Sequence, residues 1–417
     1  MTSATDRVAR ALAAGDVDRR LARIRSHGEA RDAARRRLPR GVFDYVDGGA
    51  DDEITLRRNR TAFEGVELLP RHGRFTAEPT LARTVLGIPL SMPVLTAPCG
   101  GMRLVHPHGD VGVAAAAAEV GIAHIATTAS GFTLEEIAEA PGPKLFQAYK
   151  VGSTQLMRTL VGRARDAGYL GLVATIDSVT SGHRERDYRN GFSYGMRIDL
   201  PTMARTAPKV ATRPRWLAGF VADGMPFSIP NTAHGSPGGR ALDLSALTRE
   251  TGDTLGPTWE DVDWMRANWS GPLVVKGVLT VADAERARDA GADAIVVSNH
   301  GGRQLDGSPA TLAVLPAIAA AVGGEVEVLL DSGIRRGADV AAALALGADA
   351  VLVGRLPAWG LAAGGAAGVR HVLGLLRAEL IRTLQLAGST GVDDLEPIVA
   401  RSGETSGAAS DAARIAG

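Results

Sequence analysis

Residues 288–299 read RDAGADAIVVSN, and this phrase decides the fold because variants of it recur along the chain. A helical pattern stops at a glycine, as the C-terminal ends of helices favour, and a short apolar run follows within a few residues. The chain therefore repeats a unit of helix, tight turn and buried strand. The other copies are AEVGIAHIATT (118–128), RDAGYLGLVATID (165–177) and LALGADAVLVGR (344–355).

Further apolar runs complete a set of eight candidate strands. Their continuously apolar character suits a parallel sheet that helices cover on its outer face. Eight such units favour a closed barrel over an open sheet, whose GxGxxG turn is missing here. We therefore predict an α/β protein built on a (β/α)8 TIM barrel. The further runs are MPVLTAP (92–98), KLFQAY (144–149), PLVVKG (272–277) and VEVLLDSG (326–333).

The regular spacing is interrupted once, between about residues 178 and 258, after the fourth candidate strand. A connection this long inside a compact barrel is uncommon and is usually functional or mobile. The prediction is one barrel with a long insertion after strand four. We expect an N-terminal helical extension, the barrel and a C-terminal tail over residues 1–90, 91–388 and 389–417.

Composition limits the class of protein and its compartment. Lys plus Arg number 46 and Asp plus Glu also number 46, so no overall charge favours nucleic acid as a partner. The single cysteine, Cys99, excludes an internal disulfide and a cysteine-based metal site, and we predict no metal. The N-terminus lacks an apolar signal core, and no run reaches the ~18 charge-free apolar residues that span a bilayer. These features predict a cytoplasmic protein, with contact at a membrane surface left open.

Polar residues follow nearly every candidate strand, at the end of a barrel where active sites are built. The last two strands are followed by DSGIRRG (331–337) and VGR (353–355), which supply glycine amides beside Arg335 and Arg355. Barrels commonly bind phosphate here, whereas a single arginine is more often part of a surface ion pair. Because no GxxxxGK[ST] loop is present, we predict a phosphate-bearing cofactor rather than a nucleoside triphosphate.

The stretch SNHGGRQLDG (298–307) follows the sixth candidate strand. A closed barrel would bring His300 to Asp177, and this pairing is either a general base with its partner or a structural contact. Arg303 favours the first alternative, because its planar guanidinium can clamp a substrate carboxylate. Lys276 is either a cation beside a cofactor that becomes anionic on reduction or part of an internal salt bridge. The set predicts loss of a proton or hydride from the α carbon of a 2-substituted acid.

These motifs resemble the FMN-dependent α-hydroxy-acid oxidase and dehydrogenase family, which contains glycolate oxidase, lactate oxidase, lactate monooxygenase, mandelate dehydrogenase and the respiratory L-lactate dehydrogenases. The similar segments run from about residue 38 to 388. The resemblance implies an enzyme that oxidises an (S)-2-hydroxy acid to a 2-oxo acid with FMN as cofactor. The motifs are SNHGGRQLDG, DSGIRRG, VVKGVLT (274–280), TID (175–177), VLVGR (351–355) and LPRGVFDYVDGGADDEITLRRNRTAF (38–63).

The resemblance implies a catalytic group and a substrate-binding group. His300 would be the base, Asp177 its partner and Tyr149 a tyrosine of the same site. Lys276 would lie beside the flavin ring and stabilise its reduced anion, which decides between the two interpretations of this lysine. The implied substrate-binding residues are Tyr45, with Arg184 and Arg303 as carboxylate clamps.

A larger group of residues is implied to hold FMN. Some would contact the ring or the ribityl chain, and the glycines and arginines after the last two strands would contact the phosphate. We interpret Cys99 as a small buried residue at this site rather than a redox group. Besides Lys276, the implied cofactor-binding residues are Pro98, Cys99, Gly100, Thr128, Gln147, Thr175, Ser298, Asp331, Gly333, Arg335, Gly354 and Arg355.

Other segments are most similar to mandelate dehydrogenase, followed by the respiratory L-lactate dehydrogenases. In those relatives the insertion is associated with the membrane and electrons pass to quinone. Here WLAGFVADGMPFSIP (216–230) lies beside several arginines, which suits either a membrane interface or a mobile lid. Gly100 stands where oxidases often carry alanine, which favours a dehydrogenase or monooxygenase. Ala129 stands where glycolate oxidases carry tryptophan, which leaves room for an aryl or branched substrate.

Several alternatives remain open at this stage. The enzyme could use oxygen instead of quinone, or could oxidise a peptide-derived amine, although relatives of that kind tend to lack the arginine that Arg303 supplies. A non-catalytic barrel scaffold is a third possibility. The resemblance implies a homotetramer, and residues 190–240 are the candidate for peripheral contact with the inner face of the cell membrane.

Overall fold

Eight parallel strands close into a barrel in which each strand pairs with the next along the chain and the last pairs with the first. The (β/α)8 fold is confirmed, and each candidate run supplies one strand. The barrel consists of β4 (Val94–Thr96), β5 (Ala123–Thr127), β6 (Lys144–Ala148), β7 (Gly171–Thr175), β10 (Leu273–Val278), β11 (Ala294–Val297), β12 (Glu327–Leu330) and β13 (Ala350–Val353). This computed structural model describes residues 17–151, 153–190, 210–235, 241–243, 256–395 and 399–401.

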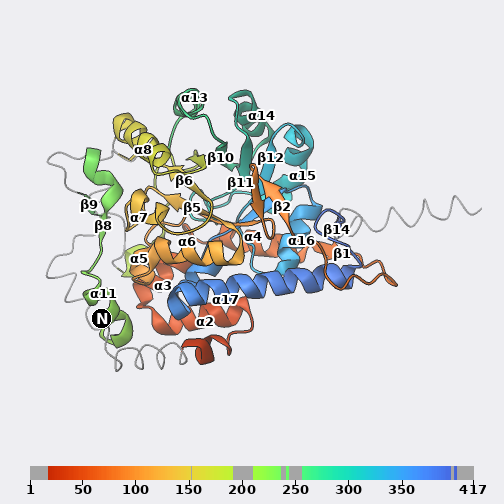
Figure 1. Cartoon of the computed structure of the whole chain (residues 1–417), viewed down its shortest axis with the longest axis horizontal. Helices are drawn as coiled ribbons and strands as arrows, with labels where there is room; N and C mark the ends of the chain where they lie inside the picture. The colour runs from red at the N-terminus through yellow and green to blue at the C-terminus, as the bar shows by residue number, and fades with distance from the viewer. Residues whose placement is uncertain are drawn as a thin grey trace, which may run out of the picture.

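Helices surround the barrel (Figure 1), and glycines make the turns that lead back into it. The glycines of the four repeated phrases, Gly121, Gly168, Gly291 and Gly347, have φ values of 79°, 82°, 78° and 105°. Residues with a side chain are strained in this region, so the glycines allow each helix to end and the next strand to start at once. The helices are α6 (Gly109–Val120), α7 (Leu134–Ala138), α8 (Thr154–Asp166), α13 (Trp259–Asn268), α14 (Val281–Asp289), α15 (Thr311–Val322), α16 (Gly337–Ala345) and α17 (Arg355–Ala387).

Alternation along the strands fills the interior of the barrel. Inward-facing residues such as Leu95, Ile125, Val173 and Val274 form one buried apolar cluster. The hairpin of β2 (Arg83–Val85) and β3 (Ile88–Leu90) adds Val85, Leu86, Ile88 and Leu90 to the same cluster. The Leu86 amide also donates to the carboxylate of Glu327, at the start of β12. The hairpin therefore closes the amino end of the barrel and leaves the carboxyl end for a site.

The segment before the barrel also contains α2 (His27–Arg37), α3 (Arg40–Asp47) and α4 (Ile54–Glu64). Figure 1 shows the long α17 running alongside α2 and α6. Short β1 (Val66–Leu68) pairs with β14 (Val399–Arg401). This segment is therefore helical with added short strands, and the predicted domain boundaries stay predictions.

The insertion after β7 contributes α9 (Glu185–Asn190) and α11 (Pro214–Ala222), and α9 packs against α3. Farther along, β8 (Ser228–Ile229) pairs with β9 (Leu242–Asp243). Residues 191–209 and 244–255 of the predicted insertion, and the predicted tail from residue 402, lie outside the described residues. Among the helices that the structure describes, none has the length and apolar character needed to cross a membrane.

Candidate active site

A cavity with about 1030 Å³ of empty space, counted to its open mouth, lies at the carboxyl ends of the barrel strands. Strand alternation explains its wall, because the residue two positions after an inward-facing core residue faces the cavity. Val173 is followed by Thr175 in this way, and Val274 is followed by Lys276. The predicted site residues that line the cavity are Tyr45, Pro98, Cys99, Gly100, Tyr149, Thr175, Arg184, Lys276, His300, Arg303, Asp331, Gly333, Arg335, Gly354 and Arg355.

The remaining predicted site residues lie behind this lining. Asp177 contacts His300, and Ser298 accepts a hydrogen bond from Lys276. The Thr128 hydroxyl donates to the backbone carbonyl of Gln147 over 3.0 Å, so it is turned towards β6. Thr127 lines the cavity in its place, as strand alternation from Ile125 requires. The same alternation, applied to the sequence, would have selected Thr127.

His300 is paired on both sides of its ring. Its Nδ1 lies 3.0 Å from Oδ1 of Asp177, and its Nε2 lies 3.4 Å from the Tyr149 hydroxyl. Burial opposes the charge of Asp177, but the attraction of His300 and Lys276 outweighs burial and holds the pKa of the carboxyl below its usual value. An ionised Asp177 keeps the proton of the neutral imidazole on Nδ1, so Nε2 is placed to accept a proton in the cavity.

The backbone at His300 is in the left-handed region, with φ of 57°, and the next two residues, Gly301 and Gly302, have φ of 70° and 74°. Such a conformation is uncommon for a residue with a side chain, and strained residues cluster at functional sites. The His300 amide donates to the Ser298 hydroxyl over 3.1 Å, and the Gly301 amide donates to the Ser332 hydroxyl over 2.9 Å. These hydrogen bonds hold the turn that directs the imidazole into the cavity.

Arg184 and Arg303 converge on one wall of the cavity. Their guanidinium carbons lie 6.0 Å and 5.2 Å from the centre of the Tyr45 ring, within the range of cation–π contacts. Nε of Arg184 donates to the Asp187 carboxylate over 2.8 Å, and Nη1 of Arg303 donates to the Tyr45 carbonyl over 2.6 Å. Two cations from different loops therefore face one volume, which suits a carboxylate ligand.

Lys276 is a buried cation with two partners. Its Nζ lies 2.9 Å from the Asp331 carboxylate and donates to the Ser298 hydroxyl over 2.8 Å. Burial alone would lower the pKa of Lys276, but the charges of Asp331 and Asp177 raise it above its usual value. The lysine thus forms the internal salt bridge considered from the sequence and also lines the cavity. It is a permanent positive charge beside any ligand bound there.

Arg335 and Arg355 form a second positive group at the ends of β12 and β13. Their side chains donate to backbone carbonyls, those of Ile334 and Gly48, rather than to carboxylates. Burial and the charge of a neighbouring arginine lower the pKa of Arg335 to about 9 and that of Arg355 to about 10. Both remain charged at neutral pH, so a bound anion would relieve their repulsion. Helix α17 starts at Arg355, and helix N-termini favour phosphate.

Buried polar atoms test whether a cofactor fits between these two charged groups. The Gln147 Nε2, the Thr175 hydroxyl and the Arg355 Nε have no hydrogen-bond partner among the described residues. Thr127 donates to Oε1 of Gln147 over 2.5 Å, which leaves the amide nitrogen as an unused donor. Buried polar groups normally have partners, so these atoms fit a polar ligand that extends along the cavity to a phosphate.

Cys99 lines the cavity but is a poor nucleophile. Burial raises the pKa of its thiol to about 11, so the thiol stays protonated at neutral pH. Its neighbour Gly354 leaves little space, since a Cβ there would lie 3.1 Å from the sulfur. This geometry supports the interpretation of Cys99 as a packing residue.

Sequence reasoning passed over several lining residues. Ser332, in the quoted DSGIRRG motif, has φ of 74°, and its hydroxyl donates to Asp331 over 2.6 Å while accepting from Gly301. The motif was the available signal, but only its aspartate, first glycine and first arginine were given roles. Met102 and Val46 also line the cavity, and neither was given a role, although Val46 lies in the quoted motif of residues 38–63.

Comparisons with known proteins give a consistent result. The family model described as FMN-dependent dehydrogenase matches residues 34–402. The pre-mycofactocin synthase of Mycobacterium tuberculosis is 42% identical over 371 residues, which cover 88% of this chain and 92% of that protein. The L-lactate oxidase of Nostoc sp. is 42% identical over 368 residues, which cover 87% of this chain and 94% of that protein.

A solved structure is also similar to this chain over most of the length of both proteins. The crystal structure of (S)-mandelate dehydrogenase, described as a monotopic membrane protein, has a TM-score of 0.84 and 36% sequence identity. The similarity covers 91% of this chain and 99% of that chain.

Proposed function

The chain belongs to the family of FMN-dependent dehydrogenases, and from that membership we propose that it oxidises an (S)-2-hydroxy acid to the 2-oxo acid. The predicted family, the hydroxy-acid oxidase or dehydrogenase class and the FMN cofactor are confirmed. The observation that carries the proposal is one cavity that holds the His300–Asp177 pair and the two arginines Arg184 and Arg303. A base and a carboxylate clamp are the two groups that this substrate class requires.

In the proposed reaction His300 accepts a proton from the substrate at Nε2. Asp177 stabilises the imidazolium that forms and keeps the ring oriented. The Tyr149 hydroxyl, 3.4 Å from Nε2, orients the substrate oxygen beside the base. Oxidation by loss of hydride and oxidation through a carbanion both need this acceptor, which takes the hydroxyl proton in the first case and the α proton in the second.

Arg184, Arg303 and Tyr45 form the proposed substrate-binding group. The planar guanidinium groups would hold the carboxylate, and both of their central carbons lie within 6.0 Å of the centre of the Tyr45 ring. The Tyr45 hydroxyl donates to the Gly100 carbonyl over 3.2 Å, which fixes the ring at the edge of the cavity. Ala129 also lines the cavity, and its small side chain leaves room for an aryl group. We therefore favour mandelate-like over lactate-like substrates.

FMN, when bound, supplies the two-electron acceptor of this oxidation. We propose that Lys276 provides positive charge beside the ring system and that Thr175 and Gln147 provide unused polar atoms to it. At the other end of the cavity, Arg335 and Arg355 would bind the phosphate. The predicted contacts of Pro98, Cys99, Gly100, Thr128, Ser298, Asp331, Gly333 and Gly354 stay predictions, and we propose Thr127, which lines the cavity, as a further contact.

For the electron acceptor we propose quinone at a membrane surface rather than oxygen. Helix α11 supports this, because Trp216 stacks on Phe220 with ring centres 4.7 Å apart while Val221 and nearby Met225 are exposed. Arg215 beside them is exposed and basic, as in helices that lie on anionic lipid. Sedimentation with anionic vesicles tests the membrane contact. If the segment is instead a lid, changes in it should alter turnover, and the protein should not bind vesicles.

The homotetramer stays a prediction, which light scattering checks.

Oxidation of a peptide-derived amine is a second candidate, because a pre-mycofactocin synthase is 42% identical to this chain. The cations Arg184 and Arg303 argue against it, since they suit a carboxylate. Anaerobic mixing of the FMN enzyme with (S)-mandelate, L-lactate or an amine separates these candidates. Fast bleaching of the flavin by a hydroxy acid is expected. Bleaching by the amine alone would refute the proposal, and slow reoxidation on admission of air would support quinone.

A further inference from the structure

We propose that Arg186 is a positioning residue that sets the separation of the two carboxylate-binding arginines, Arg184 and Arg303. It would do so through the turn of residues 48–53, which lies between α3 and α4. The inference rests on the proposed function, because it concerns how the same cavity holds a carboxylate. It adds to that function a residue that does not line the cavity.

The turn is bonded to both of the loops that carry the clamp. The amide of Ala50 donates to the carbonyl of Gly302 over 2.9 Å, next to Arg303 in the chain. The amide of Asp51 donates to the carbonyl of His183 over 2.8 Å, next to Arg184. Two neighbouring residues of the turn therefore connect the two loops, and a change in the geometry of the turn changes the separation of the two arginines.

Arg303 also depends on the turn through its own side chain. Its Nη1 donates to the Gly48 carbonyl over 3.1 Å as well as to Tyr45 at the end of α3. The turn packs closely against the loop of Gly302, because a Cβ on Gly49 would lie only 2.8 Å from the Gly302 carbonyl oxygen. Small displacements of the turn are thus passed on to the guanidinium group.

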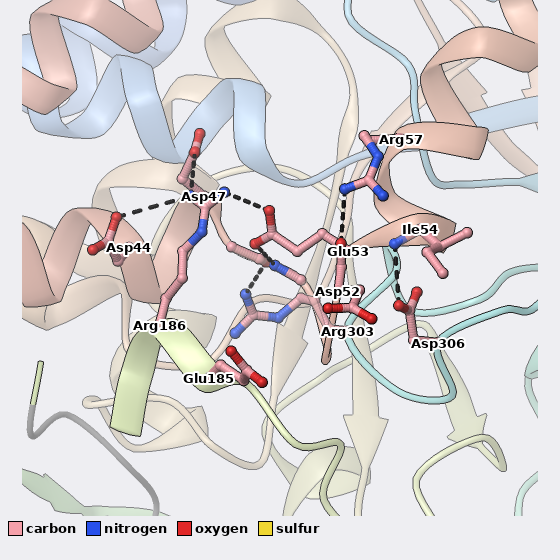
Figure 2. A network of polar contacts seen from close by, with 12 residues as sticks. Asp44, Asp47, Asp52, Glu53, Ile54, Arg57, Glu185, Arg186, Arg303 and Asp306 are labelled. Atoms are coloured by element: carbon pink, nitrogen blue, oxygen red, sulfur yellow. Dashed lines mark hydrogen bonds and ion pairs between the residues drawn. The ribbon is translucent and has the colours of Figure 1, made fainter. Parts of the chain in front are cut away.

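Arg186 does not line the cavity, and its side chain contacts the turn and the end of α3 (Figure 2). One nitrogen of its guanidinium lies 3.4 Å from the Asp47 carboxylate, and the other pairs with Glu53. Glu53 in turn accepts from the Gly49 amide over 2.9 Å. The side chains of Asp47 and Glu53 are only 6% and 15% exposed, so solvent screens these ion pairs less than surface pairs.

Arg186 is the ion-pair partner that connects Glu53, and with it the turn, to α9. Asp44 and Asp47 each keep another arginine when Arg186 is lost, because Arg40 pairs with Asp44 and Arg31 donates two hydrogen bonds of 2.6 Å and 2.7 Å to Asp47. Loss of the Arg186 charge would therefore release Glu53 and let the turn move. His300 and Asp177 have no bond to this network in the described part of the chain, so the base would keep its geometry.

The test compares Arg186→Gln with wild type as FMN enzymes. The dissociation constants of benzoylformate and of neutral 2-hydroxy-2-phenylacetamide are measured from the change in flavin absorbance. We expect benzoylformate to bind about tenfold more weakly and the amide to bind within about twofold, because a displaced clamp affects the carboxylate. The KM for (S)-mandelate should rise similarly with little change in kcat, and Arg186→Lys should restore part of the affinity.

Arg189→Gln is the matched control, because Arg189 lies on the same helix, is 73% exposed and, within the described residues, forms an ion pair only with Glu185. It should bind both ligands as wild type does. Glu53→Gln keeps an acceptor for the Gly49 amide and should repeat the Arg186→Gln result, including in the case that Arg186→Gln does not fold. Equal losses for acid and amide, or no loss for the acid, would overturn the inference. Failure of the proposed function is seen separately, as wild-type flavin that no hydroxy acid reduces.

Discussion

The two ends of the barrel differ in how their charged side chains are paired. At the amino end, the hairpin of β2 and β3 covers the core, and Asp349 is paired with both Arg83 and the Val328 amide. At the carboxyl end, Arg335 and Arg355 lie close together with backbone carbonyls as their partners. This difference indicates that the amino end stabilises the fold, whereas the arginines at the carboxyl end need a bound anion to balance their charge.

The two histidines His124 and His300 show the same contrast. His124, in β5, is hydrogen-bonded to Thr96 over 2.7 Å, and burial lowers its pKa to about 3, so it is neutral. His300 is instead paired with an ionised carboxylate and faces the cavity. An imidazole in the wall contributes packing, whereas one at the rim can exchange a proton. Substitutions at the carboxyl end should therefore lower activity, and substitutions at the amino end should lower stability.

The largest expected effect is on chemistry at the carboxyl end. His300→Gln removes the base, so reduction of the flavin by (S)-mandelate should slow by about 10³-fold. FMN content and the thermal midpoint should stay close to wild type, because no part of the core is altered. Anaerobic stopped-flow absorbance measures the rate, and a rate within tenfold of wild type would show that His300 is not the base.

The next effect is on stability at the amino end. Ile88→Ala truncates a side chain that is 6% exposed in the cluster closing the barrel, and should cost about 2–4 kcal/mol of unfolding free energy. Urea denaturation measures the loss. The kcat of the folded variant should not change. A lower kcat at full FMN occupancy would mean that the two ends are coupled, which contradicts the comparison.

A smaller effect is expected at the phosphate-binding end of the cavity. There, FMN affinity should fall, whereas the stability of the apoprotein should stay the same or rise. Arg335→Gln should weaken FMN binding about tenfold to a hundredfold, since charge-assisted hydrogen bonds to phosphate are lost. The apoprotein should be as stable as wild type or more stable, because the repulsion between Arg335 and Arg355 is removed. Fluorescence titration with FMN and melting of the apoprotein measure the two quantities. A destabilised apoprotein with unchanged FMN affinity would assign Arg335 a structural role.

The smallest effect, taken over the first pH unit below 6.5, is on the pH dependence of stability. Between pH 6.5 and about 3, His124 is protonated in the unfolded chain but neutral in the folded one, so unfolding takes up a proton. Stability should therefore fall as the pH falls below 6.5, with a contribution from His124 of up to ~1.4 kcal/mol per pH unit. His124→Gln should flatten the profile in this window. Denaturant midpoints at several pH values measure it, and parallel profiles would exclude the assignment.

The sequence was informative where structure is local or repeated. The helix, glycine and strand phrase predicted the barrel because each copy contains its own turn, as the positive φ of Gly121 and Gly291 confirms. Residues at strand ends, such as Lys276 and Arg335, were expected at one rim because parallel strands end there together. The closed barrel predicted the pairing of His300 with Asp177, and the resemblance to a known family supplied the role of His300 as the base.

Contacts between distant segments could not be predicted in the same way. No periodicity relates Arg186 to Asp47 and Glu53, which meet only because α9 packs on α3. The closure of the barrel by β2 and β3 was also missed, since their short runs precede the repeat and were included in a helical extension. Thr128 was chosen over Thr127 because strand alternation was not followed to the strand end.

The most direct test of the account is a single anaerobic turnover of the FMN enzyme with (S)-mandelate in excess, in which flavin bleaching and the amount of 2-oxo acid are measured together. The account predicts complete bleaching in wild type with one benzoylformate formed per flavin, and neither event at a comparable rate in His300→Gln. Bleaching without the 2-oxo acid, or equal turnover in the variant, would contradict it.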